Sequence, residues 1–283
     1  MSDGLSLHLA RLLAVGTPAV LVTVAEAKGS TPREEGAAML VTDVRSHGTV
    51  GGGRLEWECL AQARKLLAGG RMEAWADIPL GPRVGQCCGG RVRIRLRRAG
   101  PAELTEIEAV EAAASALLPT VLLFGAGHVG RALAAALAPL PLRLRWIDAR
   151  AGEFPHPAPP GVEVVVTERP LAEIDRAAPG SAAFVLTHSH ALDFTLCSAV
   201  LERGDFAYLG LIGSATKRAR FERGLRELGI PAERIATMAC PIGGTALRDK
   251  RPPVIAALAA AELLVALAQV RSDAAATAQE RAA

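Results

Sequence analysis

The second half of the chain alternates short apolar runs with stretches of helical periodicity. The apolar runs lie at 120–124, 142–147, 162–166, 182–186 and 206–211, and helical patterns such as 131–138, 193–203 and 215–228 separate them. Strands that alternate with helices favour βαβ units and a parallel sheet. Continuous runs such as VLLF and AAFVL are typical of parallel strands that helices cover on both faces. We therefore predict a Rossmann-like, doubly wound domain over residues 118–283.

The first 105 residues follow a different pattern and predict a small α+β domain. Strand-like segments occur at 19–27, 36–42, 71–77 and 91–97, with one helical segment at 54–67. In the segment 91–97 arginines alternate with Val92, Ile94 and Leu96, which is the period of a strand with one buried and one solvated face. Residues 102–118 carry acidic residues early and apolar residues at helical spacing, so we expect a connecting helix that contains the domain boundary. The chain as a whole is then of the α/β class.

Composition narrows the classes of function. A chain of 283 residues with 50% hydrophobic and 22% charged residues is not a disordered protein. With 32 Lys and Arg against 29 Asp and Glu, and only 4% aromatic residues, it has neither a basic surface nor stacking platforms for nucleic acid.

Its longest apolar run, 254–270, is interrupted by Glu262 and Gln269, which favours a buried or oligomer-facing helix over a membrane span. The first residues resemble no targeting signal, and we expect a cytoplasmic protein.

A glycine-rich fingerprint follows the first predicted parallel strand. Gly125, Gly127 and Gly130 form G-x-G-x-x-G between a strand and a helix, where glycines permit a tight turn and the approach of a phosphate to the helix N-terminus. His128 lies inside the fingerprint, and Asp148 ends the second strand, where an acidic residue would bind a ribose hydroxyl. These residues predict a nucleotide-type site. The alternative is that the glycines only form the turn and Asp148 only caps it.

Two more loops follow predicted parallel strands, at the edge where doubly wound sheets bind ligands. The loop 187–193 contains His188 and His190, which favour a polar ligand-facing loop, with a metal site or plain capping as alternatives. The loop 210–218 contains Ser214 and Lys217, which would hold a phosphate at a helix start or merely cap a helix with a solvated basic face.

Three glycine loops occur in the first domain, at 29–33, 51–56 and 86–90. Such a density of glycine in a small domain indicates backbone that approaches a ligand, although hairpin turns would explain any one loop. The candidate binding residues in these loops are Arg33, Gly52, Gly53, Glu56, Gln86, Cys87, Cys88, Gly89 and Gly90.

The vicinal pair Cys87 and Cys88 is the most unusual feature of these loops. Neighbouring cysteines do not easily form a disulfide with each other, and they lack the spacing of a closed zinc site. An exposed soft ligand or a sulfur carrier is one interpretation, since Arg83, Arg91 or loop amides would lower the pKa of a thiol. The other is that these cysteines are buried and inert.

Together these motifs resemble the XdhC/CoxI family, and within it the xanthine dehydrogenase accessory proteins. The resemblance spans nearly the whole chain, and one glycine expected between Pro241 and Lys250 is displaced. The motifs that carry it are GSTPR (29–33), GGGRLEWE (51–58), GPRVGQCCGG (81–90), LLFGAGHVGRAL, THSHALDF, YLGLIGSATKRARF and CPIGGTALRDKRPPVIAALAAAELL.

The resemblance implies an accessory protein that is not a turnover enzyme. It would bind the molybdenum cofactor (molybdopterin), hold it while a cysteine desulfurase installs the sulfido ligand, and pass it to apo-xanthine dehydrogenase, with a homodimer expected. Cys87 is the expected contact to the metal, and Cys88 the second choice. The alternatives are an NAD(P)-dependent oxidoreductase that acts on a small molecule, which the fingerprint and Asp148 favour, and an assembly scaffold that retains no cofactor.

Overall fold

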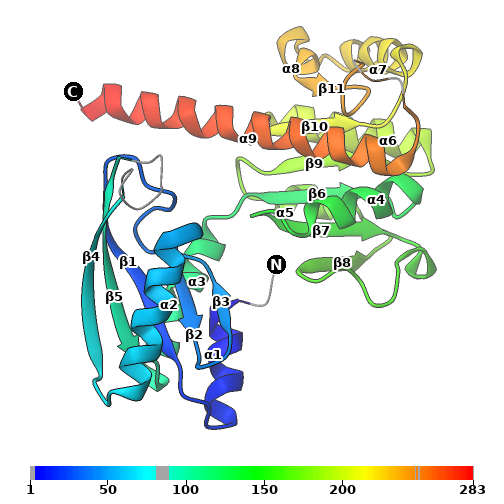
Figure 1. Ribbon diagram of the computed structural model, residues 1–283. Coiled ribbons are helices and arrows are strands. Elements are labelled where there is room, and N and C mark those ends of the chain that lie inside the picture. The colour runs from blue at the N-terminus through cyan, green and yellow to red at the C-terminus, as the bar shows by residue number, and fades with distance from the viewer. Residues whose placement is uncertain (1–3, 81–88, 246, 248, 283) are drawn as a thin grey trace. The chain divides into compact units, whose positions relative to one another are not determined.

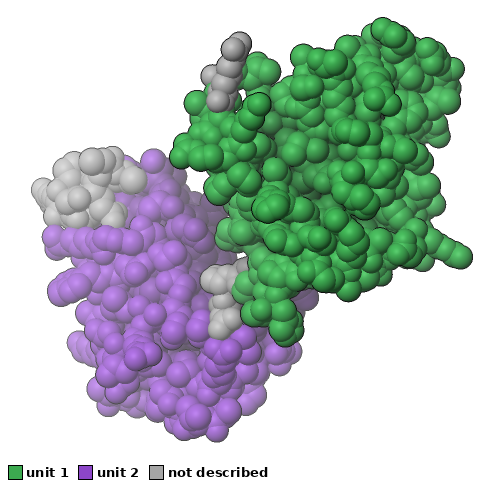
Figure 2. All heavy atoms as spheres, turned by 90° about the vertical axis from the view of Figure 1, so that its right-hand side faces the viewer, with its two compact units in different colours: residues 1, 117–283 green, residues 2–116 purple. Residues whose placement is uncertain are grey.

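The computed structural model describes residues 4–80, 89–245, 247 and 249–282. The chain divides into two compact units (Figure 2): unit 2 is Ser2–Ala116, and unit 1 is Leu117–Ala283 together with Met1. Each unit has its own sheet and its own core.

Unit 2 is an antiparallel sheet with helices on both faces (Figure 1). The strand order is β3-β2-β1-β5-β4, and each neighbouring pair is antiparallel. Its elements in chain order are α1 (Leu5–Ala14), β1 (Val20–Lys28), β2 (Ala38–Val41), β3 (Ser46–Gly48), α2 (Gly53–Ala68), β4 (Glu73–Pro79), β5 (Arg91–Arg98) and α3 (Pro101–Ala116).

The core of unit 2 lies between α2 and the sheet. Leu55, Cys59, Ala63 and Leu66 of α2 are buried at helical spacing, so one stripe of the helix covers one face of the sheet. β5 contributes alternate residues to this core, as its sequence pattern predicts. On the other face, α1 and α3 cover part of the sheet in a smaller cluster of Leu9, Leu21, Leu40 and Ile107.

Unit 1 is a parallel six-stranded sheet in the order β11-β10-β9-β6-β7-β8. Counted from its own first strand, this is the order 3-2-1-4-5-6 of dinucleotide-binding folds, and it confirms the predicted Rossmann-like architecture. The elements are β6 (Thr120–Phe124), α4 (His128–Leu137), β7 (Arg143–Asp148), η2 (Ala151–Glu153), β8 (Val162–Val166), α5 (Leu171–Arg176), β9 (Ala182–Val185), α6 (His190–Arg203), β10 (Tyr208–Leu211), α7 (Ala215–Glu227), α8 (Ala232–Ala236), β11 (Met238–Ala239) and α9 (Pro252–Ala282).

Helices cover both faces of this sheet. α4 and α9 lie side by side on one face, where Leu133 and Leu263 join a core around Trp146. α5, α6 and α7 cover the other face, with Leu196 and Phe221 in the second core. Because β6 and β9 are neighbours whose connections run to opposite sides, the loops after them flank the point where ligands bind in such sheets.

The sequence analysis judged the apolar run in α9 too interrupted to span a membrane, but the mean hydropathy of the helix does not support that argument. Within the described residues, Pro252–Val270 is long and apolar enough by length and composition to cross a membrane. Its inner side belongs to the core of unit 1 through Ala256, Ala259, Leu263 and Leu267. The same sequence pattern is therefore explained by packing against α4.

Candidate functional site

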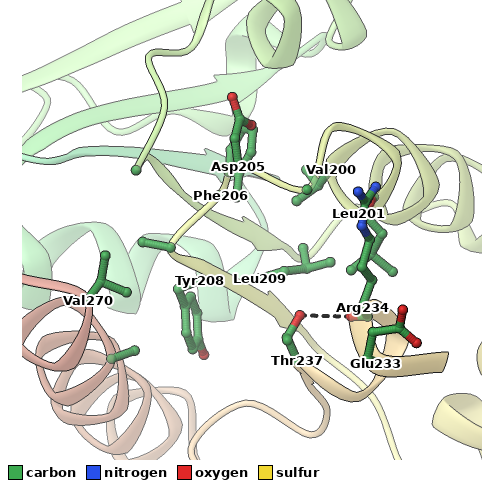
Figure 3. A pocket seen from close by; sticks show the side chains of 14 residues that line it. Val200, Leu201, Asp205, Phe206, Tyr208, Leu209, Glu233, Arg234, Thr237 and Val270 are labelled. Atoms are coloured by element: carbon green, nitrogen blue, oxygen red, sulfur yellow. Dashed lines mark hydrogen bonds between the residues drawn. The ribbon is translucent and has the colours of Figure 1, made fainter. Parts of the chain in front are cut away.

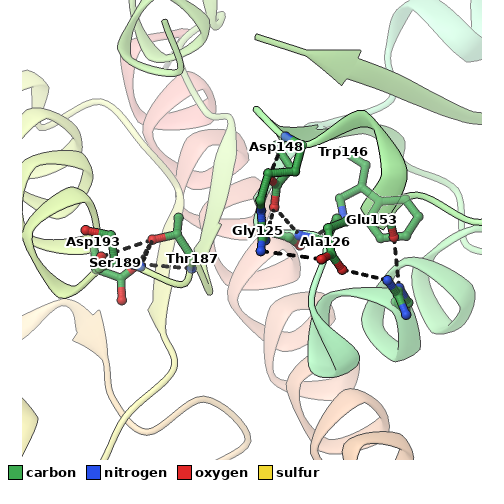
Figure 4. Close-up of polar contacts among 10 residues, drawn as sticks. Gly125, Ala126, Trp146, Asp148, Glu153, Thr187, Ser189 and Asp193 are labelled. Atoms are coloured by element: carbon green, nitrogen blue, oxygen red, sulfur yellow. Dashed lines mark hydrogen bonds and ion pairs between the residues drawn. The ribbon is translucent and has the colours of Figure 1, made fainter. Parts of the chain in front are cut away.

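The glycine fingerprint forms a tight loop at the carboxyl end of β6 (Figure 4). Gly125 has φ +114°, and a Cβ there would lie 2.3 Å from the carbonyl oxygen of Leu186. A Cβ at Gly130 would lie 2.1 Å from the carbonyl oxygen of Gly125, so α4 packs directly on the loop. In contrast, no described atom lies within 4 Å of a Cβ at Gly127, and no side chain of the described part caps α4. The loop thus leaves open space at the first turn of a helix, where backbone N–H groups attract anions.

Asp148 holds the glycine loop to β7. Its Oδ2 accepts hydrogen bonds from the backbone N–H of Ala126 (2.8 Å) and from Nη2 of Arg150 (2.9 Å), and its Oδ1 accepts from N (3.0 Å) and Nε (2.9 Å) of Arg150. Burial by itself would raise the pKa of Asp148, but the hydrogen bonds from Arg150 and Ala126 outweigh it and lower the pKa to about 2. A carboxylate has about four acceptor positions, and here all are filled. A ribose hydroxyl would have to displace Arg150 to reach this group.

The loop after β9 is held by a buried carboxylate. Asp193 Oδ1 accepts hydrogen bonds from N and Oγ1 of Thr187, at 3.0 and 2.7 Å. Asp193 Oδ2 lies 2.7 Å from Nζ of Lys217, which also donates to the carbonyl oxygen of Ile212 (2.9 Å). Ser214 caps α7 by accepting a hydrogen bond from N of Lys217. Asp193 and Lys217 therefore join the loops after β9 and β10, and the lysine points at protein groups.

Three predicted histidines are exposed along this edge. His128 begins α4, His190 begins α6, and His188 lies in the loop between β9 and α6. The residues that the structure describes contain no group of three or more metal-ligating side chains. The three side chains lie at the edge of the sheet formed by the carboxyl ends of its parallel strands.

Two cavities open at the carboxyl ends of the strands. One of about 30 Å³ lies beside Gly125, Asp148, Thr167 and His188. Another of about 350 Å³ lies where Gly213 meets the segment 241–244. A larger cavity of about 640 Å³ lies at the opposite, amino-terminal end of β9 and β10 (Figure 3) and is lined mainly by apolar side chains such as Val200, Phe206 and Leu209. None of the predicted site residues lines it.

In unit 2 the glycine loops converge. A Cβ at Gly29 would lie 3.2 Å from Cα of Gly90, and a Cβ at Gly90 would lie 2.4 Å from the carbonyl oxygen of Ser30. A Cβ at Gly51 would lie 2.5 Å from Cγ of Pro32. Gly29 and Gly90, 61 residues apart, therefore meet at backbone distance, and Gly51 meets the ring of Pro32, 19 residues before it. Only glycine permits these contacts. The described parts of the three loops that the sequence singled out separately are therefore neighbours in unit 2.

The individual residues of these loops have different roles. Gly52 and Gly53 precede and begin α2 with φ of +74° and +58°. Glu56 accepts hydrogen bonds from Oγ1 of Thr49 and from N of Gly52, so its carboxylate caps the start of its own helix. Arg33 is exposed. Gly89 is exposed as well, with no described atom within 4 Å of a Cβ there.

Gln86, Cys87 and Cys88 lie outside the described residues, so their predicted roles stay predictions. The three cysteines that the structure describes, Cys59, Cys197 and Cys240, are buried. Burial raises the pKa of Cys59 to about 12, and it also raises the pKa of the other two thiols. The described thiols are therefore poor nucleophiles and poor soft ligands at neutral pH.

The sequence analysis did not identify the side chains that hold these loops in place through hydrogen bonds. Arg150 fills the acceptor positions of Asp148, and Nε1 of Trp146 donates to the carbonyl oxygen of Gly125 (2.9 Å). Glu262 of α9 accepts a hydrogen bond from N of Gly243 (2.6 Å). Trp146, two residues before Asp148, could have indicated its contact with the glycine loop, because a buried indole N–H needs a hydrogen-bond acceptor.

Comparisons with known proteins agree with the motifs. The family described as the XdhC Rossmann domain matches residues 121–263, and the XdhC and CoxI family matches residues 12–75. The uncharacterized protein YqeB of Escherichia coli (strain K12) is 28% identical over 274 residues, which cover 94% of this chain and 46% of YqeB. The chain thus spans about half the length of this curated relative. A crystal structure described as a xanthine dehydrogenase from Bacillus halodurans shares the fold, with a TM-score of 0.73, 19% identity, and coverage of 95% of this chain and 96% of that one.

Proposed function

Because the chain belongs to the XdhC and CoxI family, we propose that it is an accessory protein of molybdenum cofactor maturation. It binds the pterin cofactor as cargo, holds it while a cysteine desulfurase supplies the sulfido ligand, and passes it to apo-xanthine dehydrogenase. It acts in the cytoplasm, as a homodimer, and without turnover chemistry of its own. The observation that carries the proposal is that the described parts of three family motifs of unit 2 meet, Gly29 with Gly90 and Gly51 with Pro32.

The chemistry of the cargo fits the residues at both candidate sites. Molybdopterin is an anionic pterin phosphate whose sulfur atoms coordinate the metal, so it needs backbone N–H donors and tolerates a soft protein ligand. In unit 2, Gly52, Gly53, Gly89 and Gly90 supply close backbone. Cys87, with Cys88 as the second choice, supplies the thiolate that contacts the metal.

Unit 1 supplies a second anion site in this proposal. The open first turn of α4 at Gly127 and His128 receives a phosphate, and His188 and Ser214 lie in the loops after β9 and β10 at the same edge. Asp148 and Lys217 act through the loops that they hold, because both are already engaged by protein groups.

An NAD(P)-dependent oxidoreductase receives less support. Its main sequence argument was a free carboxylate at Asp148 for a ribose hydroxyl, and the four hydrogen bonds to this carboxylate remove that argument. An assembly scaffold without cofactor is separated from the proposal by the cargo measurement below.

The test is to purify the full chain from a host that makes the cofactor and to measure molybdenum by mass spectrometry and pterin by fluorescence. Close to one cofactor per binding site is expected. Cys87→Ser should lower the molybdenum content more than Cys88→Ser. Gly127→Ala should lower retention through unit 1, whereas Gly152→Ala is a matched control, since a Cβ also fits there without contact. Wild-type protein that carries neither metal nor pterin would refute the proposal.

A further inference from the structure

A groove of about 400 Å³ runs between α6 and α7 on the surface of unit 1. It is formed by two helices of one unit and does not depend on any other part of the chain. His190, Phe194, Arg220, Arg223, Gly224 and Glu227 line it. His190 and Phe194 belong to the motif THSHALDF, and Arg220 belongs to YLGLIGSATKRARF. The proposed function assigns no role to the groove that these residues form.

The groove lining carries two arginines, Arg220 and Arg223, against one carboxylate, Glu227. α7 carries several basic residues, and Arg218 and Arg226 of these form ion pairs with Glu222. The side chains of Arg220 and Arg223 line the groove and have no ion pair or hydrogen bond to any residue in the described part of the chain. Most other arginines of unit 1 are paired, including Arg131, Arg145 and Arg150. Two neighbouring guanidinium groups without ion pairs on one helix therefore leave the groove net positive, although Glu227 also lines it.

The floor of the groove is apolar and aromatic. Phe194 of α6 meets Phe221 of α7 edge to face, with ring centroids 5.3 Å apart. A Cβ at Gly224 would lie 2.9 Å from Cε2 of Phe194, so the glycine lets the ring approach α7 and leaves its other side to the groove. An inorganic anion would make no favourable contact with this apolar, aromatic surface. A segment of polypeptide with an apolar side chain between acidic ones matches both the floor and the rim.

The groove adjoins the ligand edge of the sheet. His190 lines the groove and is also the first residue of α6, two residues after His188, which lies beside the small cavity at Asp148. The positive end of the α6 dipole adds to the field of Arg220 and Arg223. A protein bound in the groove would therefore lie next to whatever the loops of the edge hold.

We propose that the groove between α6 and α7 is a docking site for an acidic segment of the protein that receives the cofactor. The segment places an apolar side chain on Phe194 and carboxylates on Arg220 and Arg223. The identity of the receiving protein rests on the proposed function, whereas the acidic and apolar character of the segment rests on the groove alone.

The experiment measures binding of the cofactor-loaded full chain to immobilised apo-xanthine dehydrogenase at low and high salt. Arg220→Glu/Arg223→Glu is compared with Arg64→Glu/Lys65→Glu, which makes the same charge change at exposed residues of α2 in unit 2. The groove variant should bind about tenfold more weakly or worse, while the control should bind within about threefold of the wild type. Molybdenum and pterin content of the same preparations should be unchanged in both variants, and the milder Arg220→Gln/Arg223→Gln variant should show a smaller loss in the same direction.

Each outcome decides one of the two proposals. Equal binding of the groove variant and the wild type, or equal losses in both double variants, overturns the docking site. Titration with inorganic phosphate that detects binding to the wild type but not to the groove variant, with enzyme binding unaffected, would make the groove a small-anion site and also overturn it. A wild type that retains no cofactor overturns the proposed function, and the binding data still report on the groove.

Discussion

Nζ of Lys217 lies 2.7 Å from Oδ2 of Asp193, and the two side chains are 13% and 1% exposed. This ion pair joins the first turn of α7 to the first turn of α6. Because an unpaired buried charge costs far more than an exposed one, each partner is held in place by the other.

We predict that Lys217→Met destabilises unit 1 by about 3 kcal/mol, because it leaves the Asp193 carboxylate buried without its counterion. The variant is made in a Trp57→Phe/Trp75→Phe background, where the buried Trp146 is the sole tryptophan and reports urea unfolding of unit 1. The control is Arg226→Gln, which breaks the more exposed pair with Glu222 in the same unit and should cost less than about 1 kcal/mol. Similar losses for both variants would contradict the prediction.

The pKa of Asp148 predicts a specific acid sensitivity. Since its pKa in the folded protein is about 2 and its ordinary value is 3.8, the ionised group stabilises the fold above about pH 4, and this stabilisation is lost as the pH falls toward 2. The shift corresponds to about 2 kcal/mol. Asp148→Asn should therefore be less stable than the wild type at pH 6, by an amount that shrinks between pH 4 and pH 2. Trp146 fluorescence in the Trp57→Phe/Trp75→Phe background checks this, and Asp175→Asn, which removes an exposed carboxylate of α5, is the matched control variant.

The glycines of the fingerprint are predicted to differ in what they tolerate. Gly130→Ala places a Cβ against the carbonyl oxygen of Gly125 and should cost about 3 kcal/mol or prevent folding. Gly127→Ala meets open space at φ −69° and should change stability by less than about 1 kcal/mol. Thermal unfolding of the two variants decides the point, and a Gly130→Ala protein as stable as the wild type would show that α4 does not rest on the loop.

Thiol reactivity is predicted to separate the cysteines into two groups. With a pKa of about 12, Cys59 is a thiolate in about one molecule in ten thousand at pH 8, and the burial of Cys197 and Cys240 suppresses their ionisation in the same way. Brief treatment of the folded protein with iodoacetamide should label Cys87 and Cys88 first. Peptide mass spectrometry reads the result, with urea-unfolded protein as the fully labelled control. Early labelling of Cys59 would mean that unit 2 opens locally around α2.

Long periodic segments made most of the fold predictable. The apolar runs at β6, β7 and β9 and the alternation in β5 indicate burial directly, so the sequence indicated the class of both sheets. The short elements α8, β3 and β11 were not predicted, because two to five residues carry no measurable period. α1 was not predicted either, although Leu5, Leu9 and Leu13 recur at helical spacing and join the cluster with Ile107.

The candidate site was only partly predictable. The sequence identified the glycine loops at 29–33, 51–56 and 125–130, because glycine at such density indicates tight turns or a close approach of the backbone to another group. It did not show that Gly29 meets Gly90 or that Gly51 meets Pro32, since these contacts join segments far apart in the chain. It also interpreted Asp148 and Lys217 as ligand contacts, because both stand where ligands bind.

The sequence by itself determined the family, the two kinds of sheet and the places where the backbone must be glycine, since these depend on local period and residue type. Only the tertiary structure decided which charges are already engaged. The carboxylate of Asp148 accepts hydrogen bonds from Arg150 and Ala126, and Lys217 is paired with Asp193. In contrast, Arg220 and Arg223 have no ion pair with any described residue. The physical reason is that an ion pair depends on a few ångströms between side chains of different loops, and sequence spacing does not specify those distances.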